Sequence, residues 1–147
     1  MNEGLITPIK QCTGIYGIYV DGELVYIGKT TQTFEKRFLQ HKRLMDFPDD
    51  SETQYDMYYE LAAERAKGSC IQLCPLIIAE YVPYDSLYTL TNRDLESMEL
   101  ALIWCYRPRY NICGVKKPYK YTHLSKFFGQ LLIKGLPQFS YNNVKVT

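Results

Sequence analysis

Residues 14–28 read GIYGIYVDGELVYIG, two short runs of aliphatic and aromatic side chains with Asp21-Gly22 between them. An Asp-Gly pair between such runs predicts a β-hairpin, because both central positions of its tight turn tolerate positive φ. Side chains alternate between the two faces of a strand, and pairing the runs across a two-residue turn places Tyr16 near Tyr26. The predicted strands cover residues 14–20 and 23–28.

Two helices are expected after the hairpin. Thr31 or Thr33 can cap a helix over about 33–45, in which apolar side chains recur at helical spacing. The stretch 55–67 has the same periodicity and meets Gly68, the residue type favoured at the C′ position after a helix. Both helices are therefore expected to bury one apolar face.

The next elements are a strand and a third helix. An apolar run over 76–82 predicts a buried strand. Thr91, with Asp94 three residues later, forms a variant of the capping box and predicts a helix start. This helix must end near residue 106, because Pro108 disfavours the helical conformation in the residue before it. The predicted fold is α+β, with a small three-stranded, mostly antiparallel sheet flanked by helices.

Composition indicates a folded, single-domain protein. Of 147 residues, 46% are hydrophobic and 22% charged, which argues against disorder. The absence of a membrane-length apolar run and of a signal-peptide pattern predicts a cytoplasmic protein without a membrane partner. Five cysteines, an odd number, favour free thiols. Cys70 and Cys74 lack a second close pair of ligands, so buried thiols are favoured over structural zinc.

Charge is segregated along the chain, although the net charge is only +1. No Asp or Glu follows Glu99, whereas eight Lys or Arg do. Such segregation can give one surface a positive field that attracts phosphate, and the alternative is a solvated tail balanced by a solvated loop. The first predicted helix adds a basic cluster, and an acidic segment follows it. The cluster comprises Lys36, Arg37, Lys42 and Arg43, and the acidic segment covers residues 46–64.

One acidic residue in a basic setting is a candidate metal ligand. Phosphodiester hydrolysis needs an activated water, a stabiliser of developing charge and help for the leaving oxygen, and a divalent metal supplies two of these. Mg²⁺ takes oxygen ligands and often uses one or two carboxylates together with the substrate phosphate. Glu99 meets this requirement, and so does Glu96 one turn earlier. Helical periodicity alone does not choose between them.

Five sequence features, in the order in which they occur along the chain, resemble those of the GIY-YIG nuclease family. They are Gly14-Ile15-Tyr16, Tyr26-Ile27-Gly28, basic residues on the next helix, Glu99 and Asn111. Residues 99–111 are most similar to the nuclease domain of bacterial excision repair, in which the Glu stands four residues before the Ile of a Leu-Ile pair; this selects Glu99. The resemblance spans about residues 14–111 and implies a metal-dependent endonuclease that hydrolyses phosphodiester bonds of DNA.

The resemblance implies a role for each matching hairpin residue. Tyr16 matches the family's first Tyr, which lies at the catalytic water and is a proposed general base. A Tyr must lose its proton for that role. Tyr26 matches the second Tyr, and at Gly28 the missing side chain lets the substrate approach the backbone. Lys29 matches a Lys that would neutralise phosphate or activate the Tyr.

The resemblance also implies a role for the matching residues after the hairpin. Arg37 matches an Arg that clamps the scissile phosphate, and helical phase favours it over Lys36 because Arg37 and His41 share a face. His41 would shuttle a proton or hydrogen-bond the phosphate. Glu99 would hold one Mg²⁺ or Mn²⁺ ion, with no organic cofactor. Asn111 would either contact nucleic acid or bond its loop to the hairpin.

We expect residues 1–115 to form the catalytic domain and 116–147 a basic extension of it, with a last amphipathic helix over 122–134. The extension mixes cations with aromatic rings suited to phosphate contact and base stacking, or else it packs on the core or serves a dimer. The expected partner is DNA, duplex or branched, and paired cuts would need a homodimer. The residues expected to bind nucleic acid outside the catalytic set are Lys36, Lys42, Arg43, Asn111, Lys116, Lys117 and Lys120.

A protein of a different functional class could also have this fold. This alternative is a catalytically inactive or partner-dependent nucleic-acid-binding module. A decayed enzyme would be expected to have lost part of its catalytic set. The chain instead has every member that the resemblance requires, which favours an enzyme. These members are Tyr16, Tyr26, Arg37 and Glu99.

Overall fold

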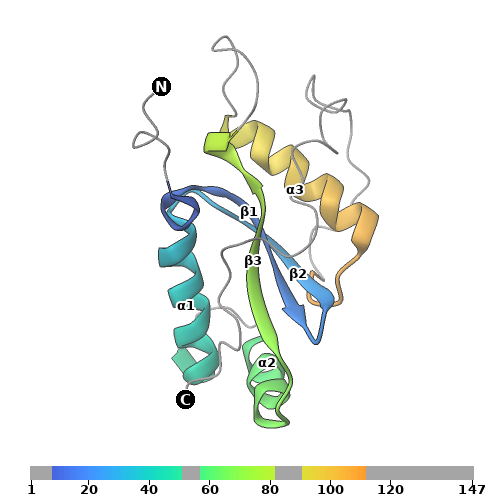
Figure 1. The fold of residues 1–147 in the computed structure, drawn as a ribbon. Helices are drawn as coiled ribbons and strands as arrows, with labels where there is room; N and C mark the ends of the chain where they lie inside the picture. Colours follow the sequence, from blue (N-terminus) through green and yellow to red (C-terminus); the bar gives the residue numbers. More distant parts are fainter. Residues whose placement is uncertain (1–7, 51–56, 82–90, 112–147) are drawn as a thin grey trace.

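The computed structural model describes residues 8–50, 57–81 and 91–111 (Figure 1). In this part of the chain, three strands form one antiparallel sheet in the order β2-β1-β3. Three α-helices flank the sheet, so the predicted α+β class is confirmed. The elements are β1 (Gly14–Val20), β2 (Glu23–Thr30), α1 (Phe34–Asp46), α2 (Met57–Ala66), β3 (Ile71–Ile78) and α3 (Asn92–Tyr106).

The sheet lies between two helical layers, with α1 on one side of it and α3 on the other (Figure 1). The central strand β1 supplies side chains to both layers. Tyr16 and Ile18 pack into the core that includes buried residues of α1 and α2, whereas Ile15 packs into the core that includes those of α3. Because both faces of β1 are buried, its side chains are held in fixed positions.

The turn between β1 and β2 has the predicted chemistry. Asp21 and Gly22 have φ values of 50° and 84°, as a two-residue hairpin turn requires. The Asp21 side chain also accepts a hydrogen bond from the backbone N–H of Cys70, at 2.8 Å, and so ties the turn to the start of β3. The second strand extends to Thr30, two residues beyond the prediction.

A β-bulge beside this turn decides which face Tyr26 occupies. The register shifts between Ile18 and Tyr19, so that Ile18 lies opposite Tyr26 and Tyr16 lies opposite Gly28. Residues that oppose each other share a face of the sheet, and a shift of one residue exchanges the faces. The bulge therefore brings Tyr26 to the face of Tyr16. In a regular two-residue hairpin the two rings would lie on opposite faces, so the predicted closeness of Tyr16 and Tyr26 is observed, but the reason given for it was wrong: it depends on the bulge.

The prediction for the third strand was wrong in its bounds. β3 begins at Ile71 instead of residue 76 and ends at Ile78, and Ala79–Tyr81 form a 3₁₀ turn. Pro75 lies inside the strand, opposite Tyr16, where the β1–β3 register is irregular. In the described sheet β3 is an edge strand, and an irregular edge strand tolerates a proline. Because the proline interrupts the apolar run, the sequence pattern did not indicate that residues 71–75 belong to the strand.

Helix ends agree with the sequence signals. Thr33, and not Thr31, caps α1 by accepting a hydrogen bond from the backbone of Lys36. Thr91 and Asp94 form the capping box of α3. That helix ends at Tyr106, and the next residue, which precedes the proline, adopts a left-handed conformation.

Asn111 covers the outer edge of β2. Its side chain accepts a hydrogen bond from the backbone N–H of Ile27 at 2.8 Å and donates one to the Ile27 carbonyl at 2.9 Å. The backbone N–H of Tyr110 donates to the Val25 carbonyl. The side-chain amide of Asn111 thus forms the two hydrogen bonds that a neighbouring strand would form with Ile27. This supports the second of its two predicted roles, bonding its loop to the hairpin.

Replacing Asn111 with Ala is expected to lower the free energy of unfolding by about 2 kcal/mol, because the Ile27 N–H and carbonyl lose their partners at a buried position. A urea unfolding curve measures the change. Asn92→Ala is the matched control, since it removes one exposed hydrogen bond, to Lys29, and should cost less than about 0.5 kcal/mol. Equal losses in the two variants would contradict a structural role for Asn111.

Several predictions fall outside the described residues, among them the helix over 122–134 and the domain division after residue 115. Within the described ranges, no helix is both long and apolar enough to cross a membrane. Four of the five cysteines are described, and they are present as thiols.

Candidate active site

Tyr16 is the centre of the candidate site. Its ring is 1% exposed, and its phenol oxygen lies 2.6 Å from Nε2 of His41. The Nε–H of Arg37 donates to the same oxygen at 3.2 Å. The strand β1 therefore supplies the phenol, and α1 supplies both of its polar neighbours.

Arg37 and His41 reach Tyr16 because they stand four residues apart on one face of α1. Phe34 and Phe38 anchor that helix in the core, and the ring of Phe38 meets the ring of Tyr16 edge to face, with centroids 5.5 Å apart. These apolar contacts set the helix against the sheet at the height of Tyr16. The predicted pairing of Arg37 and His41 on a shared face is observed.

Burial controls the protonation of this cluster. His41 is 0% exposed, and desolvation, aided by the charge of Arg37, lowers its pKa to about 3. Desolvation raises the pKa of Tyr16 well above its usual range, while Arg37 opposes the rise. At neutral pH the pair is therefore a neutral imidazole hydrogen-bonded to a neutral phenol.

Tyr26 and Gly28 complete the face around Tyr16. The rings of Tyr16 and Tyr26 have centroids 6.4 Å apart. Gly28 lies directly under the Tyr16 phenol, and a Cβ atom at that position would collide with the phenol oxygen. Glycine is thus required at position 28 for Tyr16 to keep its place.

Glu99 belongs to α3, which packs on the other side of β2, and Lys29 donates a hydrogen bond to Asn92 at the start of the same helix. Burial raises the pKa of Glu99, while the charge of Lys29 lowers it. The charge of Glu99 in turn contributes to the raised pKa of Tyr26, after burial and against the effect of Arg37. The carboxylate of Glu99 is therefore close enough to both residues to affect them electrostatically.

The environment of Glu99 suits a hard cation. Its carboxylate is half-buried, and no hydrogen bond or ion pair to it occurs among the described residues, whereas Glu96 is exposed. A desolvated carboxylate oxygen without a donor is a ligand for Mg²⁺, which needs few protein ligands when phosphate and water supply the others. In the same residues no group of three or more His, Cys, Asp or Glu side chains could hold a metal ion. A fully protein-enclosed site is therefore not present there, and a single-carboxylate site fits.

Two further contacts of the site were not predicted from the sequence. Tyr58, on α2, places its phenol oxygen 2.9 Å from Nδ1 of His41. Gln40 accepts a hydrogen bond from Nη1 of Arg37 at 3.0 Å and donates one to Gln32. In the sequence Tyr58 falls within the predicted helix over 55–67, and its place in the apolar periodicity indicates only a core position. A signal was present, since a buried tyrosine needs a partner for its hydroxyl group.

The predicted nucleic-acid contacts on α1 do not form one surface. Lys36 and Arg43 lie seven residues apart and so share a helix face, whereas Lys42 lies on another. Arg43 pairs with Asp50 at 3.3 Å. Lys36 is exposed beside the site, so it remains the best placed of the three. Lys116, Lys117 and Lys120 lie outside the described residues.

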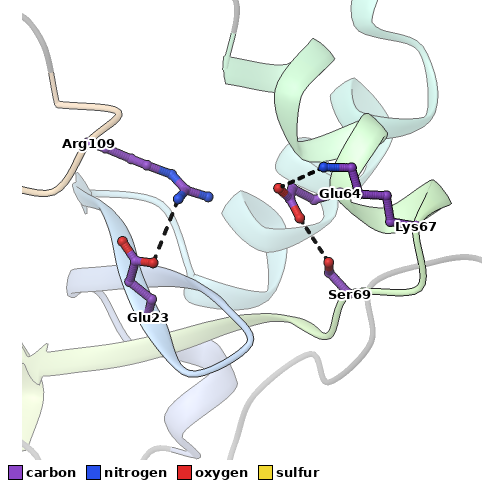
Figure 2. A network of polar contacts seen from close by, with 5 residues as sticks. All are labelled: Glu23, Glu64, Lys67, Ser69 and Arg109. Atoms are coloured by element: carbon purple, nitrogen blue, oxygen red, sulfur yellow. Dashed lines mark hydrogen bonds and ion pairs between the residues drawn. The ribbon is translucent and has the colours of Figure 1, made fainter.

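The basic residues at the opposite end of β2 lie among carboxylates (Figure 2). Arg109 pairs with Glu23 at 3.7 Å, and Glu64 pairs with Lys67 while accepting a hydrogen bond from Ser69. Mixed charge of this kind offers no continuous positive surface. This end of the sheet is therefore a poor candidate surface for phosphate.

Comparison with known proteins identifies the fold. No family model matches the sequence, and no match was found among curated proteins. Among solved structures, a mutant of EndoII of bacteriophage T4 matches with a TM-score of 0.50 and 21% sequence identity, over 73% of this chain and 79% of that one. EndoII is a nuclease of the GIY-YIG type. The chain is thus an α+β protein with the fold of a GIY-YIG nuclease.

Proposed function

We propose that this protein is a metal-dependent endonuclease that hydrolyses phosphodiester bonds of DNA. The observation that carries the proposal is the contact of Tyr16 with both Arg37 and His41, next to Tyr26, whose pKa responds to the charges of both Arg37 and Glu99. A tyrosine in a core needs only one polar partner for its hydroxyl group, whereas Tyr16 has two. The half-buried carboxylate of Glu99, which is affected by the charge of Lys29, contributes nothing to apolar packing. The fold shared with EndoII supports the same function.

Arg37 would bind the scissile phosphate. A guanidinium group has five N–H donors, and the described residues use two groups of Arg37, Nε toward Tyr16 and Nη1 toward Gln40. The remaining donors are suited to a phosphate, which accepts hydrogen bonds from a guanidinium in pairs. These two contacts hold the guanidinium plane beside the Tyr16 oxygen. Phosphate and general base would therefore be kept in contact distance of each other.

Tyr16 would act as general base in its phenolate form, which the charge of Arg37 favours. The phenolate accepts a proton from the attacking water, and the water oxygen bonds to phosphorus. The bond from phosphorus to the leaving sugar oxygen then breaks, and that oxygen takes a proton from solvent. Neutral His41 would hydrogen-bond the Tyr16 oxygen throughout.

Glu99 would hold the divalent cation, with Lys29 adding positive charge near the phosphate. When bound, Mg²⁺ or Mn²⁺ polarises phosphoryl oxygens and offsets the charge that develops in the transition state. The raised pKa of Glu99 means that a cation would also stabilise its ionised form.

The pH dependence of cleavage tests the proposed base. Because burial raises the pKa of Tyr16, its phenolate fraction is small at neutral pH and grows about tenfold per pH unit. Cleavage of supercoiled plasmid in Mg²⁺ should therefore accelerate about tenfold per unit from roughly pH 6 to 9. No inflection is expected at the usual pKa of histidine, about 6.5, because desolvation lowers the pKa of His41 to about 3.

The same assay on single-stranded DNA, branched DNA and RNA would identify the substrate class. A rate that does not change with pH, or that reaches half of its maximum at about pH 6.5, would contradict the phenolate mechanism. Binding of DNA without cleavage of any substrate would favour a nucleic-acid-binding module of the same fold.

A further inference from the structure

Gln40 connects Arg37, the candidate phosphate ligand, to the segment between β2 and α1. It lies on α1 nearly one helical turn after Arg37, and its Oε1 accepts a hydrogen bond from Nη1 of Arg37 at 3.0 Å. Its Nε2 donates to Oε1 of Gln32 at 3.1 Å. The side-chain amide of Gln40 is therefore a bridge, with Arg37 at its oxygen and Gln32 at its nitrogen.

The backbone that carries Gln32 is fixed by the last residue of β2. Thr30 is buried, and its hydroxyl group donates to the backbone carbonyl of Gln32 and accepts from the backbone N–H of Gln32, both at 3.0 Å. The next residue after Gln32 is Thr33, the cap of α1. Gln32 thus has a defined place relative to both β2 and α1, and from there its side chain reaches Gln40.

The direction of the hydrogen bonds along this path has one solution. A guanidinium group has donors and no acceptor, so Arg37 must face the oxygen of the Gln40 amide and not its nitrogen. That orientation directs the NH₂ group of Gln40 toward Gln32, which must then present its own amide oxygen. A flipped amide at either position would bring two donors together. Arg37 therefore determines the orientation of both amides.

The same contacts determine which edge of Arg37 can bind a phosphate. Its single Nε hydrogen is donated to Tyr16, and one of the two Nη1 hydrogens is donated to Gln40. The guanidinium makes no other hydrogen bond to the described residues, so one Nη1 hydrogen and both Nη2 hydrogens remain. Paired hydrogen bonds to a phosphate need a hydrogen on each of two nitrogens of one edge. The Nη1–Nη2 edge is the edge that still has them.

We propose that Gln40 is a positioning residue that holds the guanidinium plane of Arg37 with its Nη1–Nη2 edge available to the scissile phosphate. A contact at Nε alone leaves the plane able to turn, and the second contact at Nη1 stops the turn. Holding a group in its productive orientation increases the rate of the chemical step. The functional part of the proposal rests on the proposed role of Arg37 in binding phosphate. The orientation of the guanidinium does not depend on any activity.

Nitrogen NMR of the arginine side chains, on the full chain without DNA, tests the orientation. Rotation about the Nε–Cζ bond exchanges Nη1 with Nη2, so a guanidinium held at Nη1 gives two Nη signals and a freely rotating one gives a single averaged signal. Signals that disappear in Arg37→Lys belong to Arg37. We expect two Arg37 signals in the native protein and in Gln40→Glu, which keeps an acceptor, and one signal in Gln40→Met, which lacks it. Two signals in Gln40→Met, or one in the native protein, would overturn the proposal.

Cleavage kinetics test the functional part. Gln40→Met should lower the single-turnover rate at saturating protein by about tenfold, while the affinity for the same DNA duplex in EDTA changes by less than about twofold. Arg37→Lys keeps the charge and lacks both Nη groups, so in that background Gln40→Met should change the rate by less than about twofold. A native rate in Gln40→Met, or a tenfold loss in both backgrounds, would show that Gln40 does not act through Arg37.

Gln11→Met is the matched control, because it makes the same substitution at an exposed position outside α1. It should leave the Arg37 signals and the cleavage rate as they are in the native protein. Thermal unfolding midpoints of the variants separate loss of fold from loss of positioning. Absence of cleavage by the native protein would instead refute the proposed function and leave the NMR result to decide the orientation of Arg37.

Discussion

Replacing Glu99 with Gln is expected to lower Mg²⁺-dependent cleavage by about a thousandfold. The substitution keeps the size of the side chain and removes the charge that would hold the cation. Metal-ion stabilisation of a phosphoryl transition state contributes several kcal/mol, and about 4 kcal/mol corresponds to that factor. Single-turnover cleavage of a labelled duplex measures the loss. Folding should not suffer, because burial already raises the pKa of this carboxyl group.

Glu96→Gln is the matched control for this prediction. Glu96 is one helical turn earlier on α3 and is exposed, so its variant should cleave at close to the native rate. Loss of activity in Glu96→Gln with native activity in Glu99→Gln would mean that the other carboxylate is the ligand. That result would contradict the assignment of the metal to Glu99.

Replacing Tyr16 with Phe should slow cleavage by about 10²- to 10⁴-fold, the usual contribution of a general base. The ring still fills the core next to Phe38, but water loses its proton acceptor, and His41 and Arg37 lose their shared partner. The rise of rate with pH should disappear in the same variant. Single-turnover rates across the pH range measure both effects.

Tyr19→Phe provides the comparison, because Tyr19 lies on the same strand but packs with the α3 side of the sheet. Its variant should keep the native rate and the native pH profile. A thermal unfolding midpoint measured for both variants separates loss of fold from loss of chemistry. Native kinetics in Tyr16→Phe would rule out its role as base.

Much of this fold could be predicted from local signals. The Asp21-Gly22 turn and the capping box at Thr91 depend on chemistry within a few residues, which is visible in a sequence. The placement of Arg37 and His41 on one helix face follows from helical spacing alone. Glu99 was chosen over Glu96 by family resemblance, and its half-buried position next to an exposed Glu96 supports that choice.

The remaining features depend on contacts between distant segments. The bulge that brings Tyr26 to the face of Tyr16 changes the register by one residue, and no residue type in the hairpin encodes it uniquely. The first half of β3 was missed because Pro75 interrupts the run, and only the position of that strand at the sheet edge explains why the proline is tolerated.

The partners of His41 were also beyond local reasoning. Spacing predicted that His41 accompanies Arg37, but the hydrogen bond to Tyr58 joins residues 17 positions apart on different helices. The complete burial of His41, and with it the lowered pKa, results from packing between α1, α2 and the sheet. Sequence left two roles open for Asn111, and the bonds to Ile27 favour the structural one.

The most direct test of the proposal is incubation of supercoiled plasmid with the native protein in Mg²⁺, in parallel with EDTA. A metal-dependent endonuclease converts the plasmid to nicked circles or linear DNA in Mg²⁺ and leaves it supercoiled in EDTA. Plasmid that stays intact in both Mg²⁺ and Mn²⁺, or cleavage that persists in EDTA, would contradict the account.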